Sequence, residues 1–214
     1  MSATKMNGAE SLVRTLIDGG IEVCFTNPGT SEMHFCAALD LVPGLRCVLG
    51  LFEGVVTGAA DGYGRMRDFP SATLLHTGPG LGNGLANLHN ARKARSPVVN
   101  IVGEHATYHI RHDAPLTSDI DGIAAPVSDW VKTSRNAEEV STFGAQAIAE
   151  ARKTPGRIAT LILPADTAWN EASSGATVPS VPNPETVNSN VLDECVRVLR
   201  SREPVMLLLG NKGL

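Results

Sequence analysis

Residues 45–67 read LRCVLGLFEGVVTGAADGYGRMR, and this stretch decides the fold. Its apolar start, Cys47–Leu49, is typical of a buried strand, whereas the small residues of its second half predict a helix that another backbone can approach closely. Glu53 lies where the strand passes into the helix, directly after apolar and glycine residues. Burial disfavours the charged form of a carboxylate, so a glutamate in this place can keep or share a proton near neutral pH. The simpler interpretation is a negative charge placed favourably at a helix N-terminus.

Apolar runs alternate with helical patterns along most of the chain. Strands are expected at 21–25, 45–49, 72–75, 97–102 and 158–163. Helices are expected at 8–18, from Thr30 or Ser31 to Leu39, from Glu53 onward, at 81–95 and at 138–153. Gly78-Pro79-Gly80 is expected to end a strand, and 104–128 to be a loop with short helical pieces. The alternation predicts an α/β fold with a doubly wound, mainly parallel sheet flanked by helices.

Polar groups follow several of the expected strands. They are the turn at 26–29, Glu53, His76-Thr77 and Glu104. Ligands of open α/β sheets bind outside the carboxyl ends of the strands, which is where these groups fall. We therefore expect them to gather at one edge of the sheet.

Three motifs carry a resemblance to a known family. They are TNPGTSE at 26–32, FEG followed by AADGYGR within 52–65, and HTGPG followed by NG within 76–84. In this order and spacing, over roughly residues 7–171, the chain resembles the pyrimidine-binding domain of thiamine-diphosphate enzymes. Benzoylformate decarboxylase is the subgroup that it resembles most, and the acetolactate synthase large subunit is a more distant match.

The resemblance implies a catalytic role for two residues. Glu53 matches the glutamate that hydrogen-bonds the aminopyrimidine ring of thiamine diphosphate and so activates the cofactor. His76 matches a histidine that transfers protons beside the substrate. Thr30 matches a serine that contacts the substrate carboxylate; threonine keeps the hydroxyl and adds a methyl group. The competing interpretations are a core-edge histidine at His76 and a helix cap at Thr30.

The same motifs imply further binding residues. Cofactor contacts are expected at Asn27, Pro28, Gly29, Thr77, Gly78 and Asn83, besides Glu53. The segment HDAPLTSD places Pro115 and Leu116 near the cofactor and substrate, with Leu116 as a substrate contact. In the family the active site forms between two protomers, so a homodimer or a dimer of dimers is implied.

Two other kinds of site compete with this interpretation. The glycine-rich turn at 78–84 follows a strand, as a phosphate-binding loop does, but no GxGxxG frame fits because Asn83 or Leu85 replaces the last glycine. A Rossmann-type nucleotide-dependent oxidoreductase is therefore a minor alternative. His105, His109 and His112 suggest a metal site, although solvated loop histidines are commoner.

The composition excludes several classes of protein. The chain has 214 residues and a net charge of -4, which argues against a general affinity for nucleic acid or an anionic membrane. No apolar run reaches the about 18 residues of a membrane span, and the N-terminus lacks the apolar segment of a signal peptide. The four cysteines form no CxxC pair, so a reducing, cytoplasmic compartment is expected.

Three segments are expected along the chain. Residues 1–172 form the predicted pyrimidine-binding domain, and 173–187, which are rich in Pro and Ser, form a linker. A helix at about 188–201 and a strand at 205–209 follow, and together they cannot bury a core. Residues 188–214 are therefore interpreted as the truncated beginning of the family's middle domain.

The resemblance also implies parts that lie outside this sequence. In the family a separate domain binds the diphosphate and its Mg2+ through a GDG motif followed by an asparagine, and GDG does not occur here. No metal ligand is therefore assigned to this chain. The favoured hypothesis is the N-terminal portion of a thiamine-diphosphate-dependent 2-oxo acid decarboxylase or carboligase. The alternative is a non-catalytic dimerising module, so the enzymatic status of the chain by itself is left open.

Overall fold

The computed structural model describes residues 6–184 and 186–208, which divide into two units. The first unit ends at Val181 and the second begins at Pro182. The described part of the second unit contains one helix, α8 (Ser189–Leu199). None of the helices in the described ranges is long and apolar enough to cross a membrane.

A six-stranded sheet forms the centre of the first unit, and each of its neighbouring strand pairs is parallel. In spatial order the strands are β3 (Arg46–Leu49), β2 (Val23–Asn27), β4 (Ser71–Leu75), β5 (Val98–Glu104), β7 (Ile158–Pro164) and β6 (Trp130–Thr133). A separate antiparallel pair joins β1 (Met6–Asn7) to β8 (Glu171–Ala172). The predicted doubly wound, mainly parallel α/β fold is confirmed.

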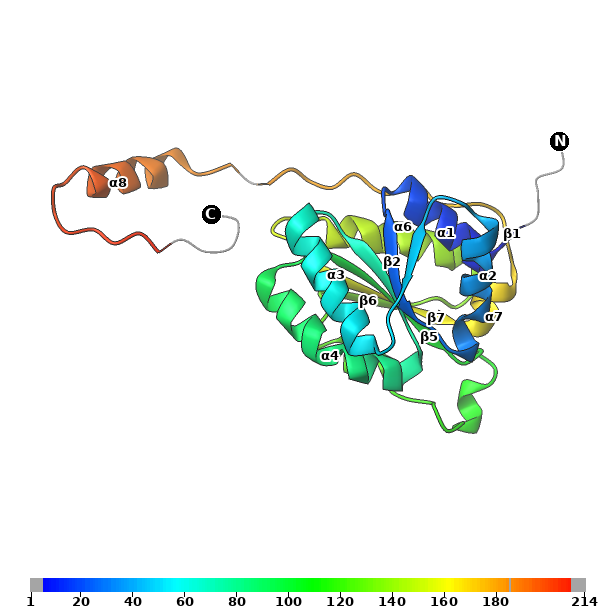
Figure 1. Ribbon diagram of the computed structural model, residues 1–214. Helices are drawn as coiled ribbons and strands as arrows, with labels where there is room; N and C mark the ends of the chain where they lie inside the picture. The colour runs from blue at the N-terminus through cyan, green and yellow to red at the C-terminus, as the bar shows by residue number, and fades with distance from the viewer. Residues whose placement is uncertain (1–5, 185, 209–214) are drawn as a thin grey trace. The chain divides into compact units, whose positions relative to one another are not determined.

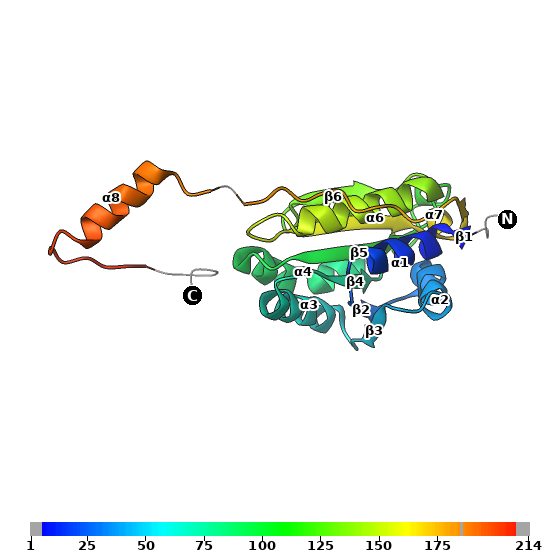
Figure 2. The same cartoon turned by 90° about the horizontal axis from the view of Figure 1, so that it is seen from above.

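Helices cover both faces of the sheet (Figures 1 and 2). One face packs against α1 (Gly8–Asp18), α2 (Met33–Leu41), α6 (Ala137–Ala151) and α7 (Ala165–Trp169). The other face packs against α3 (Glu53–Arg67), α4 (Thr77–Ala94) and α5 (Ile120–Ala124). Two single turns of 3-10 helix, η1 (Thr30–Glu32) and η2 (Ile110–His112), lie in connections at the carboxyl edge of the sheet.

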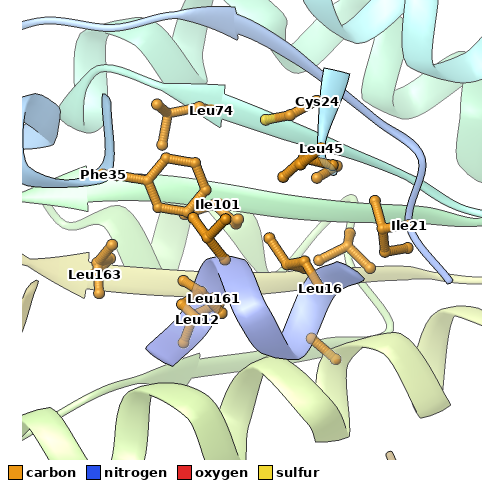
Figure 3. Packing of buried hydrophobic residues seen from close by; sticks show 14 of the residues in the cluster. Leu12, Leu16, Ile21, Cys24, Phe35, Leu45, Leu74, Ile101, Leu161 and Leu163 are labelled. Carbon is orange, nitrogen blue, oxygen red and sulfur yellow. The ribbon is translucent and has the colours of Figure 1, made fainter. Parts of the chain in front are cut away.

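The larger core cluster lies between α1 and the sheet (Figure 3). Leu12 and Leu16, one helical turn apart, are completely buried there against strand residues such as Ile101 and Leu161. Burying a leucine side chain stabilises the fold by about 1.5–3 kcal/mol relative to leaving it exposed. The leucines of this helix therefore lie on the face that packs on the sheet.

A row of buried polar side chains crosses the opposite face of the sheet. The Thr73 hydroxyl donates to Asn100 Oδ1 at 2.6 Å, and Asn100 Nδ2 donates to Thr160 Oγ1 at 3.1 Å. The Ser128 and Thr160 hydroxyls are 2.7 Å apart. Because an unpaired polar group in the core is costly, these bonds favour the one strand register that satisfies them all.

Helices α3 and α4 approach closely through their small residues. The Thr57 hydroxyl donates to the Gly84 carbonyl at 3.0 Å, and Asn87 Nδ2 donates to the Gly54 carbonyl at 2.6 Å. A Cβ on Gly84 would lie 2.8 Å from Thr57 Cγ2. The close approach predicted for the Glu53 helix is thus observed, and it fixes the start of α3 against α4.

Two elements differ from their predicted extents. Helix α4 begins at Thr77 and takes Gly78-Pro79-Gly80 into its first turn, where a proline is tolerated because those amides have no helical partner. Strand β6 was not predicted, since it has only four residues and includes the exposed Lys132.

The segment after β8 stays with the first unit before the division at Val181. The Ala176 amide donates to Thr15 Oγ1 at 2.9 Å, and Val178 packs against the α1 core. In the second unit no residue of α8 is buried. Residues 205–208 form no strand, and Leu209 of the predicted strand lies outside the described residues.

Gly84→Ala is expected to lower the free energy of unfolding by about 1–3 kcal/mol, because the added methyl group overpacks the α3–α4 contact. Gly82→Ala is the matched control on the same helix, since a Cβ there meets nothing within 4 Å. That change is expected to stabilise the chain by up to about 1 kcal/mol through helix propensity. Urea unfolding of both variants measures the difference, and equal effects would contradict the packing argument.

Candidate active site

The predicted polar groups gather at the carboxyl edge of the sheet. Strand β2 ends at Asn27, β4 is followed directly by His76, and β5 ends at Glu104. Glu53 is the first residue of α3, and Thr77 is the first residue of α4. The edge therefore brings together two helix N-termini and three strand ends.

Glu53 is held against the first turns of α4. Its side chain is largely buried, with 8% of the residue exposed. Asn83 Nδ2 donates to Glu53 Oε2 at 3.0 Å, and a Cβ on Gly80 would lie 3.0 Å from Oε1. Oε2 is thus occupied by a protein donor, and Oε1 is the oxygen left for a ligand.

A second carboxylate, Glu32, forms a pair with His76. His76 Nδ1 lies 2.8 Å from Glu32 Oε2, and the Gly29 amide donates to the same oxygen at 2.7 Å. Glu32 is only 1% exposed, and its Oε1 is buried without a hydrogen-bond partner among the described residues. A Cβ on Gly103 would overlap this oxygen, and a Cβ on Gly29 would lie 2.5 Å from the His76 ring.

Burial makes two acids of this edge hold protons more readily than they do in water. Desolvation raises the pKa of Glu32, although the Gly29 amide and His76 oppose the shift. Desolvation also raises the pKa of Glu104, which accepts the His105 amide at 2.6 Å. The charges of Asp121 and Glu32 act on Glu104 in the same direction as its burial.

Thr77 has a strained backbone next to His76. Its φ is 49°, in the left-handed region, which is a rare conformation for a β-branched residue. The residue is fully buried, and its hydroxyl has no hydrogen-bond partner among the described residues. Such strain costs about 1–3 kcal/mol and is concentrated at functional sites.

The turn after β2 is tied to the loop that precedes Glu53. Asn27 Nδ2 donates to the Gly50 carbonyl at 2.7 Å. Pro28 and Gly29 follow and are partly buried, while Thr30 opens η1 and is exposed. The bond at the start of η1 joins the Gly29 amide to Glu32, so the structure gives Thr30 no capping role.

The segment between β5 and α5 extends past the body of the unit (green, Figure 1). It is anchored at one end by Thr107, whose amide and hydroxyl donate to Asp166 at 2.9 and 2.5 Å. Near the other end, Ser118 lies so close to Gly78 that a Cβ there would clash with it. Leu116, an exposed residue, precedes this contact by two positions in the chain.

The three histidines of this segment have their rings near one another. The ring centroids of His105 and His109 are 5.8 Å apart, and those of His109 and His112 are 5.5 Å apart. Within the described ranges, no group of three or more His, Cys, Asp or Glu side chains is placed to hold a metal ion. The described residues therefore give the metal interpretation of these histidines no support.

The sequence profile described as "Thiamine pyrophosphate enzyme, N-terminal TPP binding domain" matches residues 6–125 of this chain. The chain belongs to this family. Glu32, Glu53, His76 and Glu104 of the carboxyl edge all lie within the matched residues. The Rossmann-type oxidoreductase is not supported.

The chain is similar both to a protein named as an acetolactate synthase and to a benzoylformate decarboxylase. A Mycobacterium tuberculosis protein named "Putative acetolactate synthase large subunit IlvX" is 57% identical over 206 residues, 96% of this chain and 39% of that protein. Benzoylformate decarboxylase of Pseudomonas aeruginosa is 32% identical over 196 residues, 88% of this chain and 36% of that protein.

A solved structure has the same fold. The Rhodococcus jostii RHA1 thiamine diphosphate-dependent 4-hydroxybenzoylformate decarboxylase matches with a TM-score of 0.83 and 26% identity, over 92% of this chain and 38% of that chain. The chain therefore spans less than two fifths of the length of these three relatives.

Sequence reasoning missed Glu32, the acid that contacts His76. It stands within the TNPGTSE motif, three residues after Gly29, but no role was assigned to it. The available signal was an acid directly after the turn that ends a strand. Its contact with His76 joins residues 44 positions apart, which spacing along the chain does not reveal.

Glu32→Gln is expected to change how stability depends on pH. Folding raises the pKa of Glu32 above its ordinary value of 4.5, so the folded chain binds this proton more tightly than the unfolded chain does. The resulting contribution to the free energy of unfolding is complete at pH values below the pKa of Glu32 in the unfolded chain. That stabilisation is lost as the pH rises through the folded pKa. The free energy of unfolding of the wild type should therefore fall relative to that of Glu32→Gln as the pH increases above 4.5.

Urea unfolding at a series of pH values measures this difference. Glu138→Gln, at an exposed position on α6, is the control. Parallel pH curves for the wild type and Glu32→Gln would show that burial does not favour the protonated acid.

Proposed function

We propose that this chain supplies the pyrimidine-binding half of a thiamine-diphosphate-dependent enzyme that acts on a 2-oxo acid. The observation that carries the proposal is the placement of Glu53, a buried carboxylate with one oxygen held by Asn83 and the other facing the glycine turn of α4. The relatives are named as decarboxylases and as acetolactate synthases, so decarboxylation and carboligation both fit this family.

The residues of the site fit the aminopyrimidine ring. That flat ring needs a desolvated carboxyl group able to share a proton with a ring nitrogen, and Glu53 Oε1 is free to do so. Gly80 leaves the space above the start of α4 that a side chain would otherwise fill. Asn27, Pro28, Gly29, Thr77, Gly78 and Asn83 are proposed as the remaining cofactor contacts.

His76 is proposed to move a proton beside the substrate. Glu32 occupies Nδ1, so Nε2 is the nitrogen available for transfer. Glu32 fixes the ring and its tautomer, and Gly29 lets the ring lie against the turn. Thiamine diphosphate, when bound, supplies the nucleophilic carbon for the substrate carbonyl.

Substrate contacts are proposed at Thr30, His76 and Leu116. Thr30 is exposed at the turn after β2, where its hydroxyl can donate to a substrate carboxylate. Leu116 offers apolar surface from the projecting segment. The diphosphate and Mg2+ are proposed to be bound by a domain outside this chain.

A second protomer is proposed to cover the site. The residues around Glu53 include four exposed apolar side chains, with Leu49 64%, Leu51 90%, Phe52 49% and Val55 59% exposed. Exposed apolar surface of this kind marks interaction sites, and its position beside Glu53 would exclude water from the carboxylate.

Thiamine is expected to bind the 214-residue chain, because the contacts proposed here are to its pyrimidine ring. Titration followed by amide NMR signals should shift Gly80 and Asn83, which adjoin the Glu53 carboxylate. Glu53→Gln should weaken binding about tenfold or more, since a charge-assisted bond is worth about 1.5–3 kcal/mol. The control is Glu22→Gln at an exposed position. Unchanged binding by Glu53→Gln would overturn the assignment.

Turnover separates a catalytic domain from a binding module. Release of CO2 from benzoylformate and from pyruvate is measured with thiamine diphosphate and Mg2+, for this chain alone and together with a polypeptide carrying the GDG motif. Turnover in the reconstituted sample that is abolished by Glu53→Gln supports the enzyme. Thiamine binding without turnover in either sample supports the non-catalytic module.

Leu51→Lys is expected to weaken self-association of the chain, because it places a charge among the exposed apolar side chains around Glu53. Met66→Lys is the matched control, since Met66 is also 90% exposed but lies near the other end of α3. Sedimentation velocity over a concentration series gives the dissociation constants. Equal weakening by both changes would place the interface elsewhere.

A further inference from the structure

Three of the four cysteines belong to neighbouring elements on the α2 side of the sheet. Cys24 is on β2, Cys36 is on α2, and Cys47 is on β3, the strand at the edge of the sheet. Cys24 is fully buried in the larger core cluster (Figure 3), and Cys36 packs against the same cluster. Cys47 is exposed. The group thus combines a thiol that solvent reaches with thiols that the core shields.

The strand register places Cys24 and Cys47 directly opposite each other. Strands β2 and β3 are parallel, and the two residues are paired in their ladder. Neighbouring strands lie about 4.8 Å apart, and disulfides join cysteines whose Cα atoms are about 4.4–6.8 Å apart. Both cysteines are free thiols in this structure. The register therefore gives the backbone spacing that a disulfide between them requires.

The side chain of Cys47 lies on the same face of the sheet as that of Cys24. Cys47 Sγ is 3.7 Å from the hydroxyl oxygen of Thr26. Thr26 follows Cys24 by two positions on β2, and residues two apart in a strand point to one face. Rotation about the Cα–Cβ bond of Cys47 therefore turns its sulfur from Thr26 toward Cys24.

Clustered thiols serve metal binding or redox chemistry. Within the described ranges, no group of three or more His, Cys, Asp or Glu side chains is placed to hold a metal ion. Desolvation raises the pKa of Cys24 well above its ordinary value, and the charges of Cys47 and Cys36 act in the same direction. Cys24 therefore keeps its proton at neutral pH, and an oxidant in solution meets the exposed Cys47 first.

We propose that Cys47 and Cys24 are a peroxide-sensitive pair that closes to a disulfide between β3 and β2. In the first step the Cys47 sulfur attacks hydrogen peroxide, the O–O bond breaks, and a sulfenic acid and one water form. In the second step the Cys24 sulfur attacks the sulfenic sulfur and the S–O bond breaks. The oxygen leaves with the Cys24 proton as a second water. The two thiols together lose two electrons, and the peroxide is reduced to water.

Peptide mapping after oxidation identifies which thiols are joined, and this readout needs no cofactor or substrate, so it is independent of the function proposed above. The 214-residue chain is treated with hydrogen peroxide, its remaining thiols are alkylated, and it is cleaved after Arg, Lys and Glu. Cys24, Cys36 and Cys47 then lie in separate peptides, 23–32, 33–46 and 47–53. Mass spectrometry is expected to find 23–32 joined to 47–53. A link between 33–46 and 47–53, or a sulfenic acid at Cys47 without a link, would overturn the proposal.

Substitutions test the two steps separately. Cys47→Ser, at an exposed position, is expected to abolish the link because it removes the thiol that reacts first. Cys24→Ala is expected to abolish the link and to leave the Cys47 sulfenic acid for trapping by dimedone. Cys36→Ser is the matched control on α2 and should form the link in the yield of the wild type. Thermal unfolding confirms that each variant is folded.

Cys195, which is exposed on α8, is the internal control for unselective oxidation. It is expected to remain unlinked to the other three cysteines. Links through Cys195 in the same yield as the link between Cys24 and Cys47 would show that oxidation is unselective and would overturn the proposal. Loss of the link in a folded Cys36→Ser variant would also overturn it, because Cys36 would then be needed for the reaction.

Discussion

Two buried carboxylates hold their positions because the main chain opposite them carries no Cβ. A Cβ on Gly103 would overlap the Glu32 carboxylate, and a Cβ on Gly80 would lie in tight contact with Glu53, 3.0 Å from Oε1. Gly29 makes the same room for the His76 ring. These contacts join the turn after β2, the end of β5 and the first turn of α4. The geometry of the site therefore comes from rigid elements whose backbones meet at one edge of the sheet.

Contacts elsewhere in the fold keep these backbone segments in place at the edge of the sheet. The Thr57–Gly84 and Asn87–Gly54 bonds fix α3 on α4, and with them the distance from Glu53 to its partner Asn83. The polar row through Asn100 holds β4, β5 and β7 in register. A slip of one residue would turn these side chains to the other face of the sheet and move the strand ends that carry His76 and Glu104. Stability and site geometry thus depend on the same contacts.

The features of this arrangement that depend on residues near one another in the sequence could be predicted. Apolar runs and helical spacing identified five of the six sheet strands, and Glu53 was recognisable because it stands between a strand and a helix. The short β6, with the exposed Lys132, has too little apolar pattern to be seen. The start of α4 was missed because proline and glycine normally break helices, yet the first turn tolerates them. Glu32 was missed because its partner lies on another strand end.

The segment between β5 and α5 is fastened at both ends, by Thr107 to Asp166 and by Ser118 against Gly78. The exposed residues Tyr108 and Leu116 lie between these two fastened points. Replacements there can accumulate without disturbing the acids or the imidazole on the rigid edge. Under the function proposed above, such changes would alter which substrates are accepted and leave the proposed catalytic residues in place.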